Sequence, residues 1–152
     1  MAQGLREAGV RAALLVDRCP HCIDTLRANG FEDEDGAELV CGDVNADVDY
    51  AAWRGRVDLV CGGPPCQPYS TGGFHRGAED ARDGWPAAVR AVREARPAGF
   101  LFENVTQFAV GARFAQTRER VLTALAEQGY EVRVAVDDSA RHGVPQRRRR
   151  AF

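Results

Sequence analysis

"VDLVCGGPPCQPYS" (57–70) decides the fold, because a run of apolar residues stops abruptly at two glycines and two prolines. A short apolar run bounded by turn residues is typical of a strand that is buried on both faces. Comparable strand patterns occur in "RAALLV" (11–16), "AELVCGD" (37–43), "GFLFENV" (99–105) and "YEVRVAV" (130–136). Helix patterns separate them at 20–30, after Asp83, and around 113–128. This alternation predicts an α/β fold, a mainly parallel sheet with flanking helices.

Composition points to one ordinary domain. The chain has 152 residues, of which 45% are hydrophobic, enough for a core. It contains no run of about 18 apolar residues and opens with no signal peptide, so we expect a soluble cytoplasmic protein of the bacterial cytosol or nucleoid. Five cysteines, an odd number without an export signal, indicate free thiols rather than a disulfide framework.

Charge is unevenly distributed along the chain. The net charge of −2 gives no indication of a nucleic-acid partner, and all twenty basic residues are arginine. The segment 141–150 nevertheless contains no acidic residue and ends in four consecutive arginines, whose planar guanidinium groups suit phosphates or base edges.

Polar and reactive side chains follow four of the predicted strands. In open α/β sheets, ligands bind outside the carboxyl ends of the strands. Asp17, Asp43, the 62–70 loop and the Glu103–Asn104 pair occupy those positions. The glycines and prolines therefore hold Cys66 at the functional edge, where a thiolate can act as a nucleophile if nearby positive charge lowers its pKa.

Three motifs in this order resemble the DNA cytosine-5 methyltransferase family. "GGPPCQPYS" (62–70) looks like the catalytic loop of that family, "FENV" (102–105) like its Glu-Asn-Val motif, and "GVPQRRRR" (143–150) like its Gln-x-Arg-x-Arg motif. "VDRCPHCIDTLRANGF" (16–31) is similar to the segment that holds the methyl donor. The resemblance implies an incomplete Rossmann-like fold of the S-adenosylmethionine-dependent methyltransferases.

The resemblance also implies a mechanism. The Cys66 thiolate would add to carbon 6 of cytosine, so that carbon 5 becomes nucleophilic enough to take a methyl group from S-adenosylmethionine. Glu103 would engage ring nitrogen 3 and the exocyclic amine, while Arg148 and Arg150 would hold the base carbonyl and orient the loop. Double-stranded DNA with a flipped cytosine is the implied partner, because a stacked base is out of reach.

Further contacts are implied by the matching positions. On the donor side, the resemblance places Asp17 on the ribose hydroxyls, Asp43 on the adenine amine, and Pro64 beside the cofactor. On the substrate side, the resemblance implies contacts with the DNA for five residues: Pro65, Gln67, Ser70, Asn104 and Gln146.

The chain lacks two parts of the family pattern. It contains no Phe-x-Gly-x-Gly-Gly donor loop, and its opening "MAQGLREAGV" resembles the helix that follows that loop. We therefore expect 1–152 to be a partial catalytic domain, with the glycine-rich loop and first strand missing before residue 1 and the target-recognition region missing after residue 152. Such a chain is expected to be inactive alone, with a complementary polypeptide supplying the missing segments and with no membrane partner.

Three other readings remain open. "CPHC" (19–22) at a helix start resembles thiol-disulfide oxidoreductases, and Cys19, Cys22 and either His21 or Cys41 offer a weak zinc site because no second closely spaced pair completes four ligands. A non-catalytic DNA-binding remnant would keep the DNA contact without the chemistry. The target sequence, and a role in restriction-modification or in regulation, do not follow from these residues.

Overall fold

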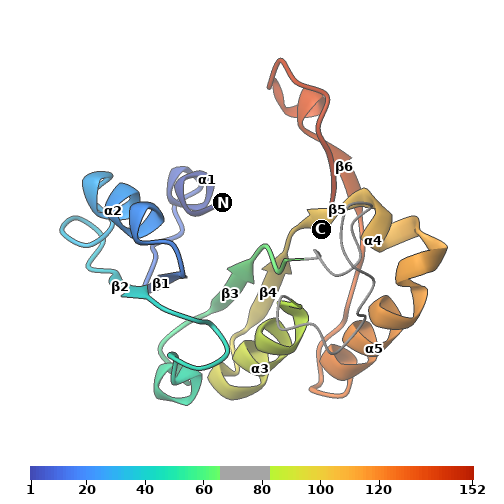
Figure 1. Cartoon of the computed structure of the whole chain (residues 1–152), viewed down its shortest axis with the longest axis horizontal. Helices are drawn as coiled ribbons and strands as arrows, with labels where there is room; N and C mark the ends of the chain where they lie inside the picture. The colour runs from blue at the N-terminus through green and yellow to red at the C-terminus, as the bar shows by residue number, and fades with distance from the viewer. Residues whose placement is uncertain (66–82) are drawn as a thin grey trace. The chain divides into compact units, whose positions relative to one another are not determined.

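A computed structural model describes residues 1–65 and 83–152, which form two compact units, Met1–Asp49 and Tyr50–Phe152 (Figure 1). We call them unit 1 and unit 2 and describe each by itself. Three predicted site residues, Cys66, Gln67 and Ser70, lie outside the described residues. Within the described ranges, none of the helices has the length and apolar character needed to span a membrane.

Unit 1 is built on two parallel strands. Its elements are α1 (Ala2–Glu7), β1 (Leu14–Asp17), α2 (Pro20–Ala28) and β2 (Glu38–Cys41). Strands β1 and β2 pair from Leu14 opposite Glu38 to Asp17 opposite Cys41, and α2 packs on both. The predicted helix limits are confirmed: Pro20 stands in the first turn, where its missing N–H costs nothing, and Gly30 follows the helix at φ 76°.

One arginine joins the first helix of unit 1 to the turn after α2. The Arg6 guanidinium forms a 2.8 Å ion pair with Asp35 and donates a 2.7 Å hydrogen bond to the Asn29 carbonyl. It also lies over the ring of the buried Phe31, 3.7 Å from the ring centroid. A cation packed on an aromatic face and paired with a carboxylate fixes α1 to this turn.

Unit 2 carries a second parallel strand pair and a small antiparallel sheet. Strand β3 (Leu59–Gly62) pairs in parallel with β4 (Gly99–Phe102). Strand β7 (Arg149–Ala151) lies between β5 (Asn104–Val105) and β6 (Val136–Asp138), antiparallel to both. The remaining elements are η1 (Tyr50–Trp53), α3 (Trp85–Ala95), α4 (Thr106–Val110), η4 (Ala112–Phe114), α5 (Ala115–Ala126) and η5 (Ser139–His142).

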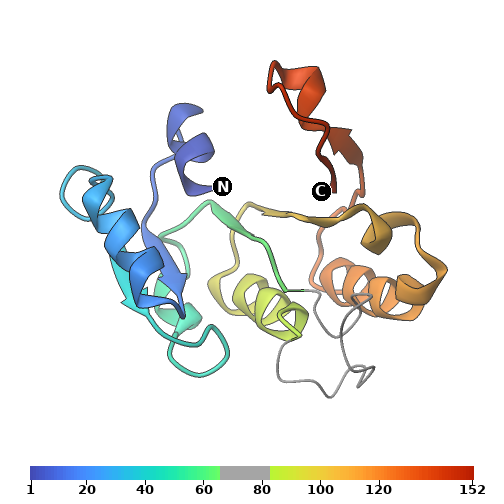
Figure 2. The same cartoon turned by 45° about the horizontal axis from the view of Figure 1, so that its top comes forward.

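The core of unit 2 is largely aromatic and is formed by residues of α3, β4, α4, η4 and α5. Helices α3 and α5 contact each other and lie side by side in Figure 2. Trp85 stacks on Phe108 with ring centroids 4.5 Å apart and meets Phe102 edge-on at 5.8 Å. Val92 and Leu125 are fully buried beside them. Phe102 ends β4, so this packing fixes the strand end from which Glu103 and Asn104 follow.

Two details differ from the sequence-based expectation. The strand predicted over 130–136 begins only at Val136 and runs to Asp138, because in the described chain residues 131–134 have no strand partner. The mainly parallel sheet is present as two separate parallel pairs, next to the antiparallel β5-β7-β6 ladder. Before α3, the Asp83 carboxylate accepts a 3.1 Å hydrogen bond from the Trp85 N–H, while Gly84 holds the N-cap position and offers no side chain to cap the helix.

Candidate active site

The centre of the candidate site in unit 2 is an ion pair between Glu103 and Arg150. Glu103 directly follows β4, and its N–H donates a 2.9 Å hydrogen bond to the Gly62 carbonyl at the end of β3. Arg150 lies in β7, and its Nε stands 2.8 Å from Glu103 Oε1. Both side chains are about three-quarters buried, with 26% and 27% of their surfaces exposed. The pairing brings together two of the four predicted catalytic residues.

The Glu103 carboxylate faces the loop that leads to Cys66. Its second oxygen, Oε2, lies in van der Waals range of Gly63, 3.5 Å from the place a Cβ would take there. Arg150 holds Oε1, so Oε2 is the oxygen that is turned toward the loop. A carboxylate oxygen accepts more than one hydrogen bond, so Oε2 can serve as an acceptor for a ligand beside this loop.

Asn104 ties the same loop to the antiparallel ladder. Its side chain is buried, with 5% of its surface exposed. The amide Nδ2 donates a 2.9 Å hydrogen bond to the Pro64 carbonyl, and Oδ1 accepts one of 2.9 Å from the Val105 N–H. The next carbonyl, of Pro65, accepts a hydrogen bond from the Gly84 N–H at 3.3 Å. The structure therefore gives Asn104 a role in positioning the loop; its predicted contact with substrate stays a prediction.

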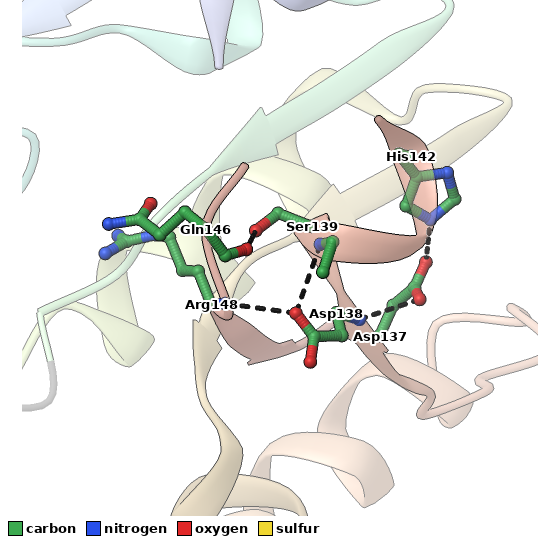
Figure 3. Close-up of polar contacts among 7 residues, drawn as sticks. Asp137, Asp138, Ser139, His142, Gln146 and Arg148 are labelled. Atoms are coloured by element: carbon green, nitrogen blue, oxygen red, sulfur yellow. Dashed lines mark hydrogen bonds and ion pairs between the residues drawn. The ribbon is translucent and has the colours of Figure 1, made fainter. Parts of the chain in front are cut away.

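The predicted Gln-x-Arg-x-Arg residues belong to a hairpin formed by β6, η5 and β7 (Figure 3). The Arg148 N–H donates to Asp138 Oδ1 at 3.0 Å, and Ser139 Oγ donates to the Gln146 carbonyl at 2.7 Å. These bonds fix the backbone at Arg148 and Gln146 and leave their side-chain groups for a ligand.

A pocket of about 340 Å³ opens between this hairpin and the end of β4. Its ionisable lining residues are Glu103, Asp137, His142, Arg148 and Arg150. Sequence reasoning did not find two of them, Asp137 and His142, whose carboxylate and imidazole lie 2.6 Å apart. The available signal was a histidine five residues after an acid, just before the Gly-Val-Pro turn.

The predicted donor-binding carboxylates lie in unit 1, at the carboxyl ends of its two strands. Asp17 ends β1 and accepts a 2.8 Å hydrogen bond from the Cys19 N–H. Asp43 follows β2; its Oδ1 accepts from the Asn45 N–H at 2.8 Å and its Oδ2 pairs with Arg18 at 2.7 Å. The Asn45 N–H, and after it the charge of Arg18, hold the pKa of Asp43 below its usual value. Both carboxylates are thus placed as hydrogen-bond acceptors at strand ends.

The Cys-x-x-Cys segment stands at the start of α2. The pKa of the Cys19 thiol is lowered by the backbone N–H of Cys22, and further by the Cys22 thiol and the His21 N–H. The same thiol contact raises the pKa of Cys22. Within residues 1–65 and 83–152, no cluster of three or more His, Cys, Asp or Glu side chains could hold a metal ion.

Comparison with known proteins decides the family. The model of the C-5 cytosine-specific DNA methylase family matches residues 1–152. The chain belongs to this family. The prediction drawn from three motifs in order is therefore confirmed, and the methylase matches extend over both units, the Cys-x-x-Cys segment included.

Curated relatives of this methylase chain are longer proteins. The Type II methyltransferase M.PspPI of Psychrobacter sp. (strain TA137) is 34% identical over 154 residues, covering 99% of this chain and 35% of its own length. The Type II methyltransferase M.Eco47II of Escherichia coli is 35% identical over 153 residues, with the same coverage, 99% and 35%. The chain thus spans about a third of the length of these relatives.

Solved structures confirm the methyltransferase fold. A DNA modification methyltransferase encoded within an E. coli prophage superposes with a TM-score of 0.72 at 23% identity, covering 97% of this chain and 40% of that one. The S. pombe Dnmt2 methyltransferase gives 0.63 at 18% identity, with coverage of 99% and 44%. The mixed α/β structure of the methylase chain corresponds to an incomplete version of this fold, as the sequence predicts.

Proposed function

We propose that this chain carries the catalytic residues for transfer of a methyl group to carbon 5 of cytosine in DNA, through a covalent adduct with Cys66. One observation carries the proposal: Arg150 holds the Glu103 carboxylate beside Gly63, in the loop that leads to Cys66. A carboxylate fixed next to a nucleophile loop is what an electron-poor ring needs when a thiolate attacks it.

In the proposed reaction the Cys66 thiolate forms a bond to carbon 6 of a flipped cytosine. Negative charge then builds on the ring, and Glu103 engages ring nitrogen 3 and the exocyclic amine to stabilise it. Arg148 and Arg150 hold the base carbonyl. After carbon 5 has taken the methyl group, whose bond to the donor sulfur breaks, that carbon gives its proton to solvent water, the ring double bond re-forms and the thiolate leaves. Double-stranded DNA is the proposed partner, and Pro65, Gln67, Ser70 and Gln146 are its proposed contacts.

S-Adenosylmethionine would supply an electrophilic methyl group, which no protein side chain offers. The residues present fit this donor: Asp17 and Asp43 are acceptors at strand ends, as ribose hydroxyls and an adenine amine require, and each carboxylate has lone pairs beyond those already engaged. Pro64, before the catalytic cysteine, is the proposed donor contact of unit 2.

A complementary polypeptide is part of the proposal, because the family's glycine-rich donor loop and target-recognition region are not among these residues. The chain alone is then expected to transfer little methyl. An apolar pocket in unit 2 has room for a further strand; β4, residues 132–134 and the end of β7 line it together. The Phe152 and Ala135 backbones exchange two hydrogen bonds, of 2.8 and 2.9 Å, so an added strand continuing β7 would enter this pocket in register.

Covalent trapping tests the function. A chimera joins residues 1–152 to the parts of M.PspPI that flank the aligned region, and it is incubated with S-adenosylmethionine and duplex DNA containing 5-fluorocytosine. We expect a covalent DNA adduct that Cys66→Ala abolishes and that Glu103→Gln slows by about 10²- to 10³-fold. A chimera that binds this DNA without forming the adduct would show a DNA-binding remnant instead.

The isolated chain is the matching control. With tritium-labelled S-adenosylmethionine and cytosine-containing DNA, we expect incorporation close to that of its Cys66→Ala variant. Substantial incorporation that depends on Cys66 would contradict the need for a complementary polypeptide and leave the chemistry in place.

A further inference from the structure

Arg150 pairs with one carboxylate, and the strand register brings a second to the same face of the ladder. Residue 137 of β6 lies directly opposite residue 150 of β7. Ala135 and Phe152, two positions away, exchange both backbone hydrogen bonds, so the 137–150 pair is of the same hydrogen-bonded type, with Cα atoms about 5.5 Å apart. Side chains of directly opposed residues project from the same face of the ladder. Asp137 is therefore a competitor of Glu103 for the Arg150 guanidinium.

The competing carboxylate is occupied on both of its oxygens. His142 Nε2 lies 2.6 Å from Asp137 Oδ2, and the Asp138 N–H donates a 2.8 Å hydrogen bond to Oδ1 (Figure 3). Meanwhile Arg150 directs its Nε to Glu103 and its Nη1 to the Arg149 carbonyl at 2.8 Å. Contact with His142, then with the Asp138 N–H, lowers the pKa of Asp137, so this group is ionised at neutral pH.

We propose that His142 is a positioning residue, which engages Asp137 and thereby leaves Arg150 to hold Glu103 toward the catalytic loop. The inference rests on the proposed function for the meaning of Glu103, but the geometry it predicts can be measured without any reaction. Without the imidazole, Asp137 would face a guanidinium with five donors in a planar fork, a strong bidentate match.

Other charges near the pair do not remove this competition. Arg141 also lowers the pKa of Asp137, but its contribution is smaller than those of His142 and the Asp138 N–H. Arg148, just before β7, and Glu103, just after β4, both line the same pocket. The backbone N–H of Arg148 is bound to Asp138, so it is that neighbouring acid, and not Asp137, that anchors this part of the hairpin.

A suppressor pair of variants tests the proposal in the full chain without DNA or donor. The readout is the Nε–Hε NMR signal of Arg150, assigned by its loss in Arg150→Lys. We expect His142→Ala to shift or broaden this signal, and Asp137→Asn in the same chain to restore it, because the competing charge is gone. His142→Gln, which keeps an N–H donor, should retain most of the signal, and His21→Ala, an exposed histidine of unit 1, should leave it unchanged.

The suppressor separates positioning from a merely structural role, since a hairpin damaged by losing His142 would not recover when Asp137 is also changed. An unchanged Arg150 signal in His142→Ala, or no recovery in the double variant, overturns the proposal. If His142→Ala fails to fold, the same comparison is made with His142→Phe, which keeps a ring but has no N–H donor, and its Asp137→Asn double variant, where an equal signal in all three chains overturns it.

The chimera then separates this inference from the proposed function. His142→Ala should slow adduct formation roughly ten- to a hundredfold, and the double variant should recover the rate. The expected NMR changes with no adduct in any chimera would sustain the positioning role and contradict the proposed chemistry. A normal adduct rate in His142→Ala would contradict the positioning role alone.

Discussion

Cys19 and Cys22 of unit 1, three positions apart, have thiol pKa values that are shifted in opposite directions, for one structural reason. The first residue at a helix start receives the free N–H groups of the turn that follows, and Cys19 occupies that place before α2. Its pKa is lowered chiefly by the Cys22 N–H, whereas the pKa of Cys22 is raised by its hydrogen bond to Cys19. Acidity at this site is thus a property of position in the helix, and it gives Cys19 the larger thiolate fraction.

We therefore expect iodoacetamide to modify Cys19 faster than Cys22 near pH 7, as measured by mass spectrometry of the two sites after brief labelling. Cys22→Ala should slow the reaction of Cys19 only in part, because the backbone N–H that contributes most is retained. Equal labelling rates at the two positions of the wild-type chain would contradict the assignment.

Single residues of the candidate site could be predicted from the sequence where they belong to a recognisable motif. Residues that meet only through the pairing register of two strands could not be predicted. Glu103 and Arg150 were both found from motifs, and the structure joins them at 2.8 Å. Asp137 and His142 were missed, because their place beside Arg150 depends on which residue of β6 stands opposite which residue of β7. A shift by one residue would turn Asp137 to the other face, and the sequence alone does not fix that register.

Between elements, one buried amide connects the catalytic loop to the antiparallel ladder. Asn104→Ala would leave the Pro64 carbonyl and the Val105 N–H without their partners, at a cost of roughly 1–3 kcal/mol for each buried group that stays unsatisfied. We expect a lower urea midpoint with an unchanged slope, followed by tryptophan fluorescence. Trp53 and Trp85 both lie in unit 2, so the signal reports on the unit that is altered.

An exposed amide of the same unit is the matched control. Gln116 lies on the exposed face of α5 in unit 2, so Gln116→Ala should change stability by less than about 0.5 kcal/mol. Equal midpoints for Asn104→Ala and wild type would show that water replaces both lost hydrogen bonds and that the loop is not tied at this point.

Elements with strong local signals were predictable, and those that depend on a neighbouring strand were not. Helix α2, with a proline in its first turn and a glycine beyond its end, was predicted within two residues. The strand expected over 130–136 was displaced, since its apolar alternation favours an extended chain but a ladder also needs a partner. In the described structure that partner is β7, which pairs with residues 136–138 and, through Phe152, with Ala135.

For the whole molecule, the fact that residues 131–134 have no strand partner in the described chain predicts how unit 2 would respond to an added strand. Gly99 and Glu103 donate their N–H groups to β3, so alternation along β4 turns the N–H groups of Phe100 and Phe102 the other way. These phenylalanines line the apolar pocket together with residues 132–134. A segment continuing β7 would therefore meet hydrogen-bonding groups on both sides and an apolar floor.

Alternation also predicts which added residues should be apolar. Ala151 is buried and Phe152 is 42% exposed, so the first and third residues added after Phe152 would face the core. We expect an appended Val-Thr-Val-Thr to raise the Tm of unit 2 by several degrees, because burying a valine contributes roughly 1–2 kcal/mol and 1 kcal/mol corresponds to about 4–8 °C in a unit of this size. Appended Thr-Val-Thr-Val has the same composition with the faces exchanged and should raise it less. Equal Tm values for the two extensions would mean that no strand enters the pocket.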